Sequence, residues 1–510
     1  MDELSHLLCQ VASHGGRTAI LQDGEVLSYT ELMRRSNGFA GYLLSNGFGE
    51  RGFLASALPN GREQLIVHLG AFLAGVPLIR LRPTTPSPQL HHCLKTIPTL
   101  GLVASGEIIG SIDREYLPKF VVEQDWFDRC AEQPKNPGVV WQNIELIAAE
   151  NSDRIATITF TSGTTARPKG VIHSRRAVAN AVKRAIGVVG YQPEDVVLVR
   201  MAMYAQIGMI VQALPALVVG ATVELANAIP SEAYRKAMAS RPLKTLFFEA
   251  PVVLADVMRN PDATGAGMEQ LRAIWAGGDF ITPRIQSKIF AITGRYVSVA
   301  YGMTEVGLIS VLHPTSRRPE GGLVGFPLPD TRVRIVDDLG QEVASNQKGN
   351  IQVMAPSSFD GYWNLPELTR SVLGPDGWIS TGDIGRLSDS GELQLLGRSK
   401  EMMVINNWKV APIEVETVLV SHPGVQQAVV VGVEDDEGKT RIEAFVIPRE
   451  GFEPSPSRED ILELANERLE KFMVPSEVYF VRRLPHFPTG KVDRERLAMI
   501  SLAGLLGDLL

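Results

Sequence analysis

The stretch TFTSGTTARPKGV, residues 159–171, places five hydroxyl side chains and two glycines around one lysine, Lys169. It follows the apolar run IATI, residues 155–158, which predicts a buried strand. A strand, a loop of small residues and then a helix make a phosphate-binding layout, because the backbone N–H groups of such a loop converge on an anion. The stretch therefore predicts an anion site where this strand ends.

The residue types inside the loop agree with an anion site. Gly163 permits a positive φ and a close approach of the backbone, and Pro168 stiffens the chain before the lysine. A Walker A loop is excluded, because that motif needs glycine directly before its lysine. The letters SGTT alone are equally typical of a surface turn. The predicted phosphate contacts are Thr161, Ser162, Gly163, Thr164, Thr165 and Lys169.

Short apolar runs alternate with amphipathic stretches on both sides of this loop. The runs TAILQ, DVVLVRMA, TVEL, TLFFEA, AIWAGG and YVSVAYG predict buried strands. Residues 174–189 and 283–294 predict helices between several of them. This alternation predicts an α/β fold, with a parallel or mixed sheet between helical layers.

The bulk composition narrows the class of protein. A length of 510 residues allows more than one domain with ample core. A net charge of -7 leaves no basic excess for nucleic acid. Cys9, Cys93 and Cys130 match no zinc or disulfide framework, which favours a reducing compartment. The first residues, MDELSHLLCQ, do not resemble a secretory signal, so a cytoplasmic protein is expected.

Residues 201–223 carry no formal charge and are long enough to cross a bilayer. However, they contain Gln206, Gln212 and Pro215. We expect a buried helix followed by a strand, LVVGATVEL, at residues 217–225, rather than a membrane span.

The pattern changes after about residue 320. The runs VRIVDD, GNIQVMA and GELQLLG predict strands of a small β-rich subdomain, and NLPELTR and GPDGWISTGD are expected to be surface loop. Residues 413–424 and 457–473 predict helices, and 425–435 and 440–449 predict strands. Ser457 is the expected cap of the later helix, with Asp460 at the capping-box position. The apolar ending ISLAGLLGDLL is expected to dock on the body or on a partner.

The full stretch TSGTTARPKGV resembles the phosphate loop of the adenylate-forming superfamily: acyl- and aryl-CoA synthetases, luciferases and peptide-synthetase adenylation domains. Further segments similar to that family follow in its order: AGGDF (276–280), YGMTE (301–305), STGDIG (380–385), GRSKEMM (397–403) and PTGKVDR (488–494). Each segment alone is weak, but their shared order makes the resemblance specific. Among these enzymes, acyl-CoA synthetase-like AMP-dependent ligases are the most similar.

The resemblance implies a domain plan. Residues 1–397 would form a large multi-layered domain, with two αβ subdomains and a small β-barrel-like one. Residues 398–400 would form a hinge, with Lys400 as its pivot. Residues 401–510 would form a small, mobile α+β domain.

The resemblance also implies roles for single residues. Tyr301 would stack on adenine, Thr304 would contact the α-phosphate and Glu305 would help to hold Mg²⁺. Asp383 would bond the ribose hydroxyls, and Arg398 would contact ribose or phosphate. The other implied ATP contacts are Gly277, Gly278, Asp279, Gly302 and Met303.

The implied reaction joins an organic acid to ATP. Lys491, from the small domain, would bridge the acid's carboxylate and the α-phosphate, while Lys169 holds the terminal phosphates. Both reactants are anions, so catalysis would come from positioning and charge neutralisation. The carboxylate is already ionised at neutral pH, so no general base is required. The product is an acyl adenylate, which then reacts with a thiol.

The implied acid pocket lies near MAMYAQIGM, residues 201–209. Relatives that activate α-amino acids carry an aspartate where this chain has Ala205, so an α-ammonium group would lack a partner. Glu249 would either contact a polar group of the acid or face solvent. The candidate pocket residues are Met203, Tyr204, Ala205, Gly208, Phe248, Glu249, Ala276 and Ala300, although such apolar residues are as often plain core.

Two thiols are candidates for the acceptor of the acyl group. CoA ligases often carry glycine where this chain has Asn407. Either a side chain there narrows a thiol tunnel, or the asparagine simply adopts the left-handed conformation, as asparagine often does. CoA is the first candidate, and the phosphopantetheine arm of a carrier protein is the second. A degenerate, non-catalytic binding protein is a further alternative, against which Lys491, Glu305, Asp383 and Arg398 argue. Nothing in the sequence favours a luciferase-type oxygenase.

Overall fold

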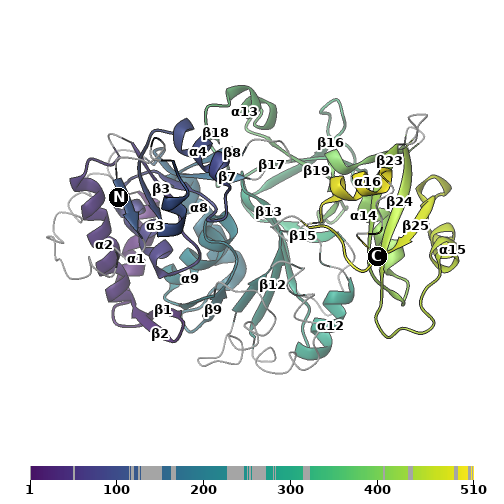
Figure 1. Ribbon diagram of the computed structural model, residues 1–510, viewed down its shortest axis with the longest axis horizontal. Coiled ribbons are helices and arrows are strands. Elements are labelled where there is room, and N and C mark those ends of the chain that lie inside the picture. Colours follow the sequence, from purple (N-terminus) through teal and green to yellow (C-terminus); the bar gives the residue numbers. More distant parts are fainter. Residues whose placement is uncertain are drawn as a thin grey trace.

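The computed structural model describes residues 2–49, 52–113, 115, 120–123, 127, 152–161, 168–226, 246–249, 251, 254, 271–278, 281, 283–313, 322–405, 408–434, 440–486, 492–503, 507 and 509. These residues form a large N-terminal lobe and a small C-terminal lobe, at opposite ends of the view in Figure 1. The expected fold class, mixed α/β with a large first domain and a small second one, is confirmed.

The larger sheet of the N-terminal lobe contains thirteen described strands. Pairing is parallel from β1 through β10, β9, β11 and β12 to β13, and it becomes antiparallel beyond β13. The strand order is β16 (Arg332–Val336), β17 (Gly349–Met354), β19 (Ile379–Leu387), β20 (Leu393–Arg398), β15 (Leu323–Pro327), β14 (Gly307–Leu312), β13 (Ser298–Met303), β12 (Ala273–Gly277), β11 (Leu246–Glu249), β9 (Val196–Val199), β10 (Thr222–Leu225), β1 (Thr18–Gln22) and β2 (Glu25–Ser28).

A second sheet contains seven described strands and also belongs to the N-terminal lobe. Its order is β18 (Gly361–Tyr362), β8 (Lys169–Ser174), β7 (Ile155–Thr161), β4 (Leu78–Arg80), β3 (Phe53–Ala57), β5 (Thr99–Ala104) and β6 (Phe120–Glu123). The predicted β-rich subdomain is joined to the first sheet through β15, which pairs with both β14 and β20. The expected alternation of strands and helices is thus borne out in both sheets.

Helices cover these sheets (Figure 1). They are α1 (Glu3–Ser13), α2 (Tyr29–Ser45), α3 (Arg62–Ala74), α4 (Ser87–Thr96), α5 (Gly106–Gly110), α8 (Arg175–Ala185), α9 (Leu214–Val219), α12 (Pro283–Thr293) and α13 (Pro366–Val372). Two π-helical segments, η2 (Ile186–Gly190) and η3 (Ile207–Ala213), adjoin α8 and α9. Helix α3 is buried along its whole length after its first residue, so it lies inside the lobe.

Three local predictions were wrong. The loop after β7 leads into strand β8, antiparallel to β7, and not directly into a helix. Helix α8 begins only at Arg175, where the Ser174 side chain caps it. Residues 217–219 end helix α9, because Gly220 adopts the left-handed conformation that stops a helix, and the strand begins at Thr222. The segments expected to be surface loop contain α13 and the start of β19.

The C-terminal lobe combines a three-stranded sheet, a two-stranded sheet and three α-helices among its described residues. Ser457 and Asp460 form the expected capping box, with each side chain bonded to the other's backbone N–H. Leu509, in the apolar ending, is buried with Leu497 and Phe445 of the same lobe. The elements are β21 (Met403–Ile405), β22 (Trp408–Val410), α14 (Pro412–Val420), β23 (Val425–Glu434), β24 (Thr440–Pro448), α15 (Arg458–Arg468), β25 (Glu477–Phe480) and α16 (Arg494–Leu502).

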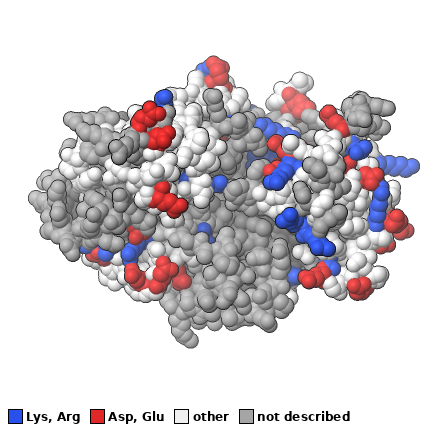
Figure 2. Space-filling view, viewed as in Figure 1, with Lys and Arg blue, Asp and Glu red and all other residues white. Residues whose placement is uncertain are grey.

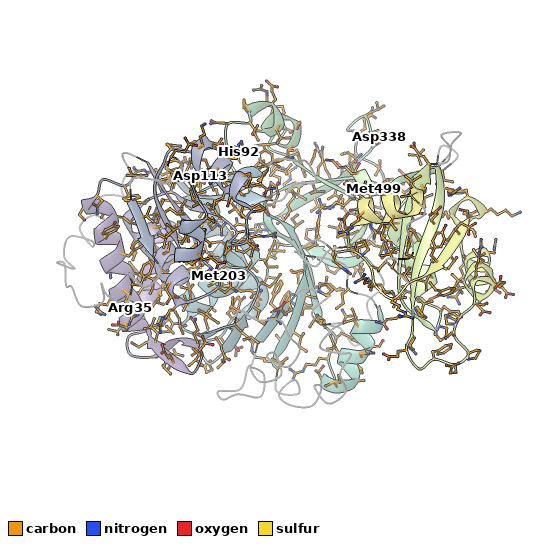
Figure 3. The ribbon with its side chains drawn as sticks, in the orientation of Figure 1. Arg35, His92, Asp113, Met203, Asp338 and Met499 are labelled. Atoms are coloured by element: carbon orange, nitrogen blue, oxygen red, sulfur yellow. The ribbon has the colours of Figure 1, made fainter. Side chains whose placement is uncertain are left out.

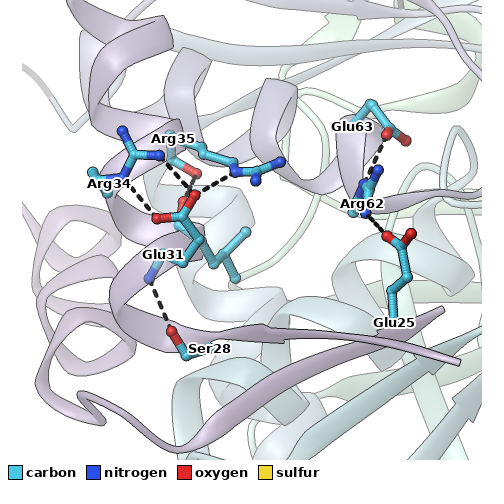
Figure 4. Close-up of polar contacts among 9 residues, drawn as sticks. Glu25, Ser28, Glu31, Arg34, Arg35, Arg62 and Glu63 are labelled. Carbon is cyan, nitrogen blue, oxygen red and sulfur yellow. Dashed lines mark hydrogen bonds and ion pairs between the residues drawn. The ribbon is translucent and has the colours of Figure 1, made fainter. Parts of the chain in front are cut away.

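Surface charges are mixed in sign. On the face in Figure 2, basic and acidic side chains are interspersed over the C-terminal lobe. On helix α2, Glu31 accepts hydrogen bonds from Arg34 and Arg35, and its own N–H is capped by Ser28 (Figure 4). The hydrogen bond from Arg34 is the main cause that lowers the pKa of Glu31 to about 2. Exposed pairs of this kind contribute little to stability.

Helix α1 is fastened to the lobe by a buried ion pair. The Arg175 guanidinium donates hydrogen bonds to both carboxylate oxygens of Asp2, and both side chains are almost fully buried. Arg175 also donates to Ser5 and to the Phe72 carbonyl. Asp2 in turn accepts the Ser5 N–H and caps α1. Burial alone would raise the pKa of Asp2, but the hydrogen bond and charge of Arg175 outweigh it and lower the pKa.

We expect Asp2→Asn to lower the free energy of unfolding by about 3 kcal/mol at pH 7, because Arg175 stays buried without a counter-charge. Since the folded pKa of Asp2 is lowered, this contribution is present above the ordinary carboxyl pKa of about 3.9 and is lost as the pH falls through the folded value. Chemical unfolding from pH 7 to pH 3 measures it. The exposed control Asp23→Asn should change little, and an equal effect at every pH would contradict the prediction.

Candidate active site

The ends of the predicted phosphate loop are adjacent in space. Thr161 closes β7 and Lys169 opens β8, and these two residues are partners across the antiparallel pair. A Cβ at Gly170 would lie 2.9 Å from Ile158 Cγ2, so only glycine fits behind the lysine. The residues between these ends, Ser162, Gly163, Thr164 and Thr165 among them, lie outside the described residues. The loop is therefore anchored at both ends by one strand pair.

The segment YGMTE forms the tight connection between β13 and β14. A Cβ at Gly302 would lie 2.3 Å from the Gly307 carbonyl oxygen, which explains the glycine at this position. Glu305 lies in the connecting turn, and its Oε1 accepts a hydrogen bond of 2.7 Å from the Tyr362 hydroxyl. The Lys169 ammonium lies 5.7 Å from the centre of the same Tyr362 ring. Tyr362 thus joins two predicted site residues.

Tyr362 was missed by the sequence reasoning. It belongs to the two-residue strand β18, which pairs with β8, and its neighbour Gly361 has a φ of 132°. Burial first, and then the charge of Glu305, raise the pKa of Tyr362. The phenol therefore stays protonated and can donate to the carboxylate. An aromatic residue directly after such a glycine was the available signal, in the letters FDGYW.

Three predicted nucleotide residues from distant parts of the chain meet in one cluster. The Tyr301 hydroxyl donates to Asp383 Oδ2 at 2.5 Å, and Arg398 Nε lies 2.8 Å from Asp383 Oδ1. Tyr301 and Asp383 are 7% and 6% exposed, whereas the Arg398 side chain is about half exposed. Burial, and then the Asp383 charge, raise the pKa of Tyr301. The phenol and the guanidinium hold the carboxylate between β13, β19 and β20.

The predicted hinge follows this cluster directly. Lys400 lies in a short exposed 3₁₀ turn, Ser399–Glu401. The two lobes touch through Ile384, Leu396 and Ala411, which form a small apolar cluster. Lys491 lies outside the described residues, but the segments on either side pair through His486 and Val492.

The predicted pocket residues are mostly buried in the large lobe. Met203, labelled in Figure 3, is fully buried, and so are Phe248 and Ala276. Phe248 stacks on Trp275 with ring centres 6.0 Å apart. Ala300 is 5% exposed, and Ala205 and Tyr204 are half-buried. The pocket segment thus adjoins an apolar interior.

Two glycines of this region have little room for a side chain. A Cβ at Gly208 would lie 2.4 Å from the carbonyl oxygens of Met201 and Ala202. A Cβ at Gly277 would lie 3.0 Å from the Ala300 carbonyl oxygen. Gly278 has a φ of 89°, and Asp279 lies outside the described residues.

Glu249 does not face solvent, so that alternative was wrong. It is 2% exposed, and its Oε1 lies 3.7 Å from Arg200 Nε. The sequence reasoning also missed Asn60, whose amide bonds the carbonyls of Arg200 and Met201 and the N–H of Met203. Asn60 therefore holds the start of the pocket segment from outside it.

Comparison with known families decides the class of protein. Residues 8–363 match the family described as AMP-binding enzyme, and residues 414–491 match the AMP-binding enzyme C-terminal domain. The chain is an AMP-binding enzyme. The predicted superfamily is therefore confirmed.

Relatives of this AMP-binding enzyme cover nearly its whole length. A long-chain-fatty-acid–CoA ligase of Escherichia coli O157:H7 is 24% identical, over 96% of this chain and 92% of its own. An isonitrile lipopeptide synthase of Streptomyces coeruleorubidus is 30% identical over 96% of this chain, which spans 33% of that protein. A 3-hydroxybenzoate–CoA/4-hydroxybenzoate–CoA ligase of Thauera aromatica is 27% identical over 95% and 94%.

Solved structures share the fold. ATP-bound MatB from Rhodopseudomonas palustris has a TM-score of 0.87 at 24% identity, over 97% of this chain and 98% of that one. The amide bond synthetase McbA from Marinactinospora thermotolerans has a TM-score of 0.86 at 26% identity, over 97% and 99%. The AMP-binding enzyme is thus an AMP-forming acid–thiol ligase, which activates a carboxylic acid with ATP to an acyl adenylate and passes it to a thiol.

The described part of this AMP-binding enzyme contains neither a membrane-spanning helix nor a cluster of metal-ligating side chains. None of its helices combines the length and apolarity that a membrane crossing requires. No group of three or more histidine, cysteine or acidic side chains lies close enough to hold a metal ion, within the ranges that the structure describes.

Proposed function

We propose that this enzyme activates an apolar aryl or medium-chain carboxylic acid and transfers the acyl group to CoA. The observation that carries the proposal is the convergence of site residues from distant segments. Tyr301, Asp383 and Arg398 form one cluster, and Glu305 and Lys169 meet at Tyr362. Side chains that bind ribose, phosphate and metal would thereby face one nucleotide.

Charge neutralisation is the chemistry that these residues would supply. Lys169 and the N–H groups of its loop would hold the terminal phosphates. Lys491 would bridge the acid's carboxylate and the α-phosphate, so that two anions can approach in line. The oxygen of the carboxylate would attack the α-phosphorus and pyrophosphate would leave. The acyl adenylate would then be attacked by the thiol, which releases AMP.

Glu305 fits a magnesium ligand. One carboxylate oxygen is bonded to Tyr362, which orients the group and leaves the other oxygen for a cation. Magnesium prefers one or two carboxylates together with phosphate oxygens, so the Glu305 carboxylate suits ATP-bound Mg²⁺. The ion would offset the charge of the leaving pyrophosphate.

Asp383 and Arg398 would bind the ribose, with Tyr301 packed against the adenine. Arg398 ends β20, two residues before Lys400, and its side chain forms an ion pair with Asp383. We propose that the domain boundary lies at residues 398–400 and that the small lobe rotates there between the two half-reactions. Rotation would withdraw Lys491 after the adenylate has formed.

The pocket favours an acid without an α-ammonium group. Its walls include Met203 and Phe248, and position 205 is alanine. Glu249 is engaged by Arg200, which leaves it poorly suited to pair a second cation. We expect apolar acids to release pyrophosphate about 10²-fold faster than α-amino acids, because a buried ammonium without a partner costs roughly 2 kcal/mol or more.

Pyrophosphate release over a panel of acids, each with and without CoA, tests the function. Benzoates, medium-chain fatty acids and α-amino acids form the arms. Release with an apolar acid and formation of its CoA ester are expected. If no acid gives an AMP ester in the presence of ATP and magnesium, the proposal fails.

A carrier protein is a second candidate acceptor. The similarity to the isonitrile lipopeptide synthase, of which this chain spans about a third, favours it. Asn407 would narrow the path for free CoA. We expect Asn407→Gly to raise turnover with free CoA, measured as acyl-CoA formation at fixed acid. No change, or a fall, would contradict a constriction at this residue.

A further inference from the structure

A layer of polar side chains lies buried on one face of the smaller sheet. The strand register places Ser56 beside Arg80, Arg80 beside Thr159, and Thr157 beside His173. Helix α3 meets this layer through Gln64, whose Oε1 accepts a 2.7 Å hydrogen bond from the Ser56 hydroxyl. All of these side chains are buried. Each buried polar atom that lacks a partner needs a physical explanation.

Arg80 is the charged member of this layer and is fully buried. Its Nη2 donates to Thr159 Oγ1 and, at 2.5 Å, to Gln206 Oε1. Its Nε and Nη1 have no hydrogen-bond partner. Among the described residues, no carboxylate forms an ion pair with it, and no acidic group contributes to the shift of its pKa. Burial lowers the pKa of Arg80 to about 9, so the side chain is still a cation at neutral pH.

The neighbours of Arg80 supply more donors than acceptors. The Gln64 amide nitrogen has no hydrogen-bond partner. His68 Nδ1 lies 2.8 Å from the Gln64 carbonyl and donates to it, so Nε2 carries only a lone pair. Burial, and then the charge of Arg80, lower the pKa of His68 to about 3, which keeps the ring neutral. The acceptors left over are His68 Nε2 and Thr157 Oγ1, and both are without partners.

We propose that the N–H groups of Arg80 and Gln64, together with the Thr157 hydroxyl, bind a small inorganic anion of halide size, such as chloride. A buried cation without a counter-charge is strongly unfavourable, and water can complete hydrogen bonds but cannot balance the charge. These three side chains are each 1% exposed or less, so an anion bound among them would be shielded from bulk solvent.

The anion would fix the orientation of the Arg80 guanidinium, which contacts two segments of the candidate active site. Arg80 donates a hydrogen bond to Thr159, which lies two residues before Thr161 in β7. It also holds Gln206, the residue before η3, whose amide nitrogen lies 3.1 Å from the His173 ring. Both contacts depend on the orientation of the guanidinium. The site needs neither ATP nor an acid, so its test is independent of the proposed function.

Bromide provides the direct test, because it replaces chloride and scatters anomalously. Crystals of the full chain grown or soaked in sodium bromide should give an anomalous peak in contact with the Arg80 guanidinium. In solution, sodium chloride should raise the unfolding temperature by about 1–3 °C over sodium gluconate at equal ionic strength, and the effect should saturate. No bromide peak beside Arg80, or equal unfolding temperatures in the two salts, overturns the proposal.

Variants assign the solution effect to this site. Arg80→Met keeps much of the volume but removes the charge, and it should lose the chloride-specific shift. Arg34→Met removes an exposed arginine of helix α2 and should keep the shift. A chloride-specific shift that persists in Arg80→Met contradicts the site. If Arg80→Met does not fold, the bromide experiment on the unmodified chain decides.

Discussion

Replacing Lys491 with alanine is expected to lower acid-dependent pyrophosphate release by about 10³-fold or more, because the removed ammonium would stabilise charge at the reacting carboxylate and α-phosphate. The effect should fall on the first half-reaction alone. Thiol transfer from a supplied acyl adenylate should stay close to that of the unmodified enzyme, since the lysine would be withdrawn for that step. Pyrophosphate release and acyl-CoA formation, measured separately, distinguish the two.

A matched control is available in the same lobe. Lys471 opens an exposed 3₁₀ turn between α15 and β25, so Lys471→Ala removes the same charge from the small domain. It should leave both half-reactions unchanged. Equal pyrophosphate release by the Lys491→Ala variant and the unmodified enzyme would remove Lys491 from the reaction. Equal losses in both half-reactions would point to misfolding of the lobe instead.

Glu305→Gln is expected to lower pyrophosphate release by about 10³-fold at saturating acid, because the site loses the carboxylate that would hold magnesium against the phosphates. The Tyr362 hydroxyl would still find an oxygen to donate to, so the fold is expected to survive. Titration with magnesium measures the effect. The variant should need more magnesium than the unmodified enzyme, and an unchanged magnesium requirement would contradict the assignment.

Tyr362→Phe tests whether the Tyr362 hydroxyl orients the Glu305 carboxylate, because it leaves that carboxylate free to bind magnesium. The change removes one hydrogen bond to Glu305 and leaves the aromatic ring beside Lys169. We expect pyrophosphate release to fall by about 10-fold, which corresponds to the loss of one hydrogen bond to a charged group. Glu367 on α13 forms an exposed ion pair with Arg370. Glu367→Gln is therefore the control, and it should leave activity unchanged.

Much of the architecture followed from local pattern. The runs 18–22, 222–225 and 273–277 are apolar and bounded by turn residues, and they form β1, β10 and β12. The capping box at Ser457 was predictable because its hydrogen bonds span only a few residues. The boundary between helix α9 and the following strand was misplaced, because it lies at Gly220 and not before residue 217. Apolar residues suit a buried helix and a buried strand equally, so their pattern alone does not locate this boundary.

The candidate site was predictable as a set of segments but not as a set of contacts. The sequence by itself determined the family and the order of the motifs. Only the tertiary structure decided that the Tyr301 hydroxyl meets Asp383, that Tyr362 reaches Glu305, and that Arg80 is buried with two of its nitrogens unpaired among the described residues. Strand register and packing create these contacts between residues far apart in the chain, and no local pattern records which side chains the fold brings together.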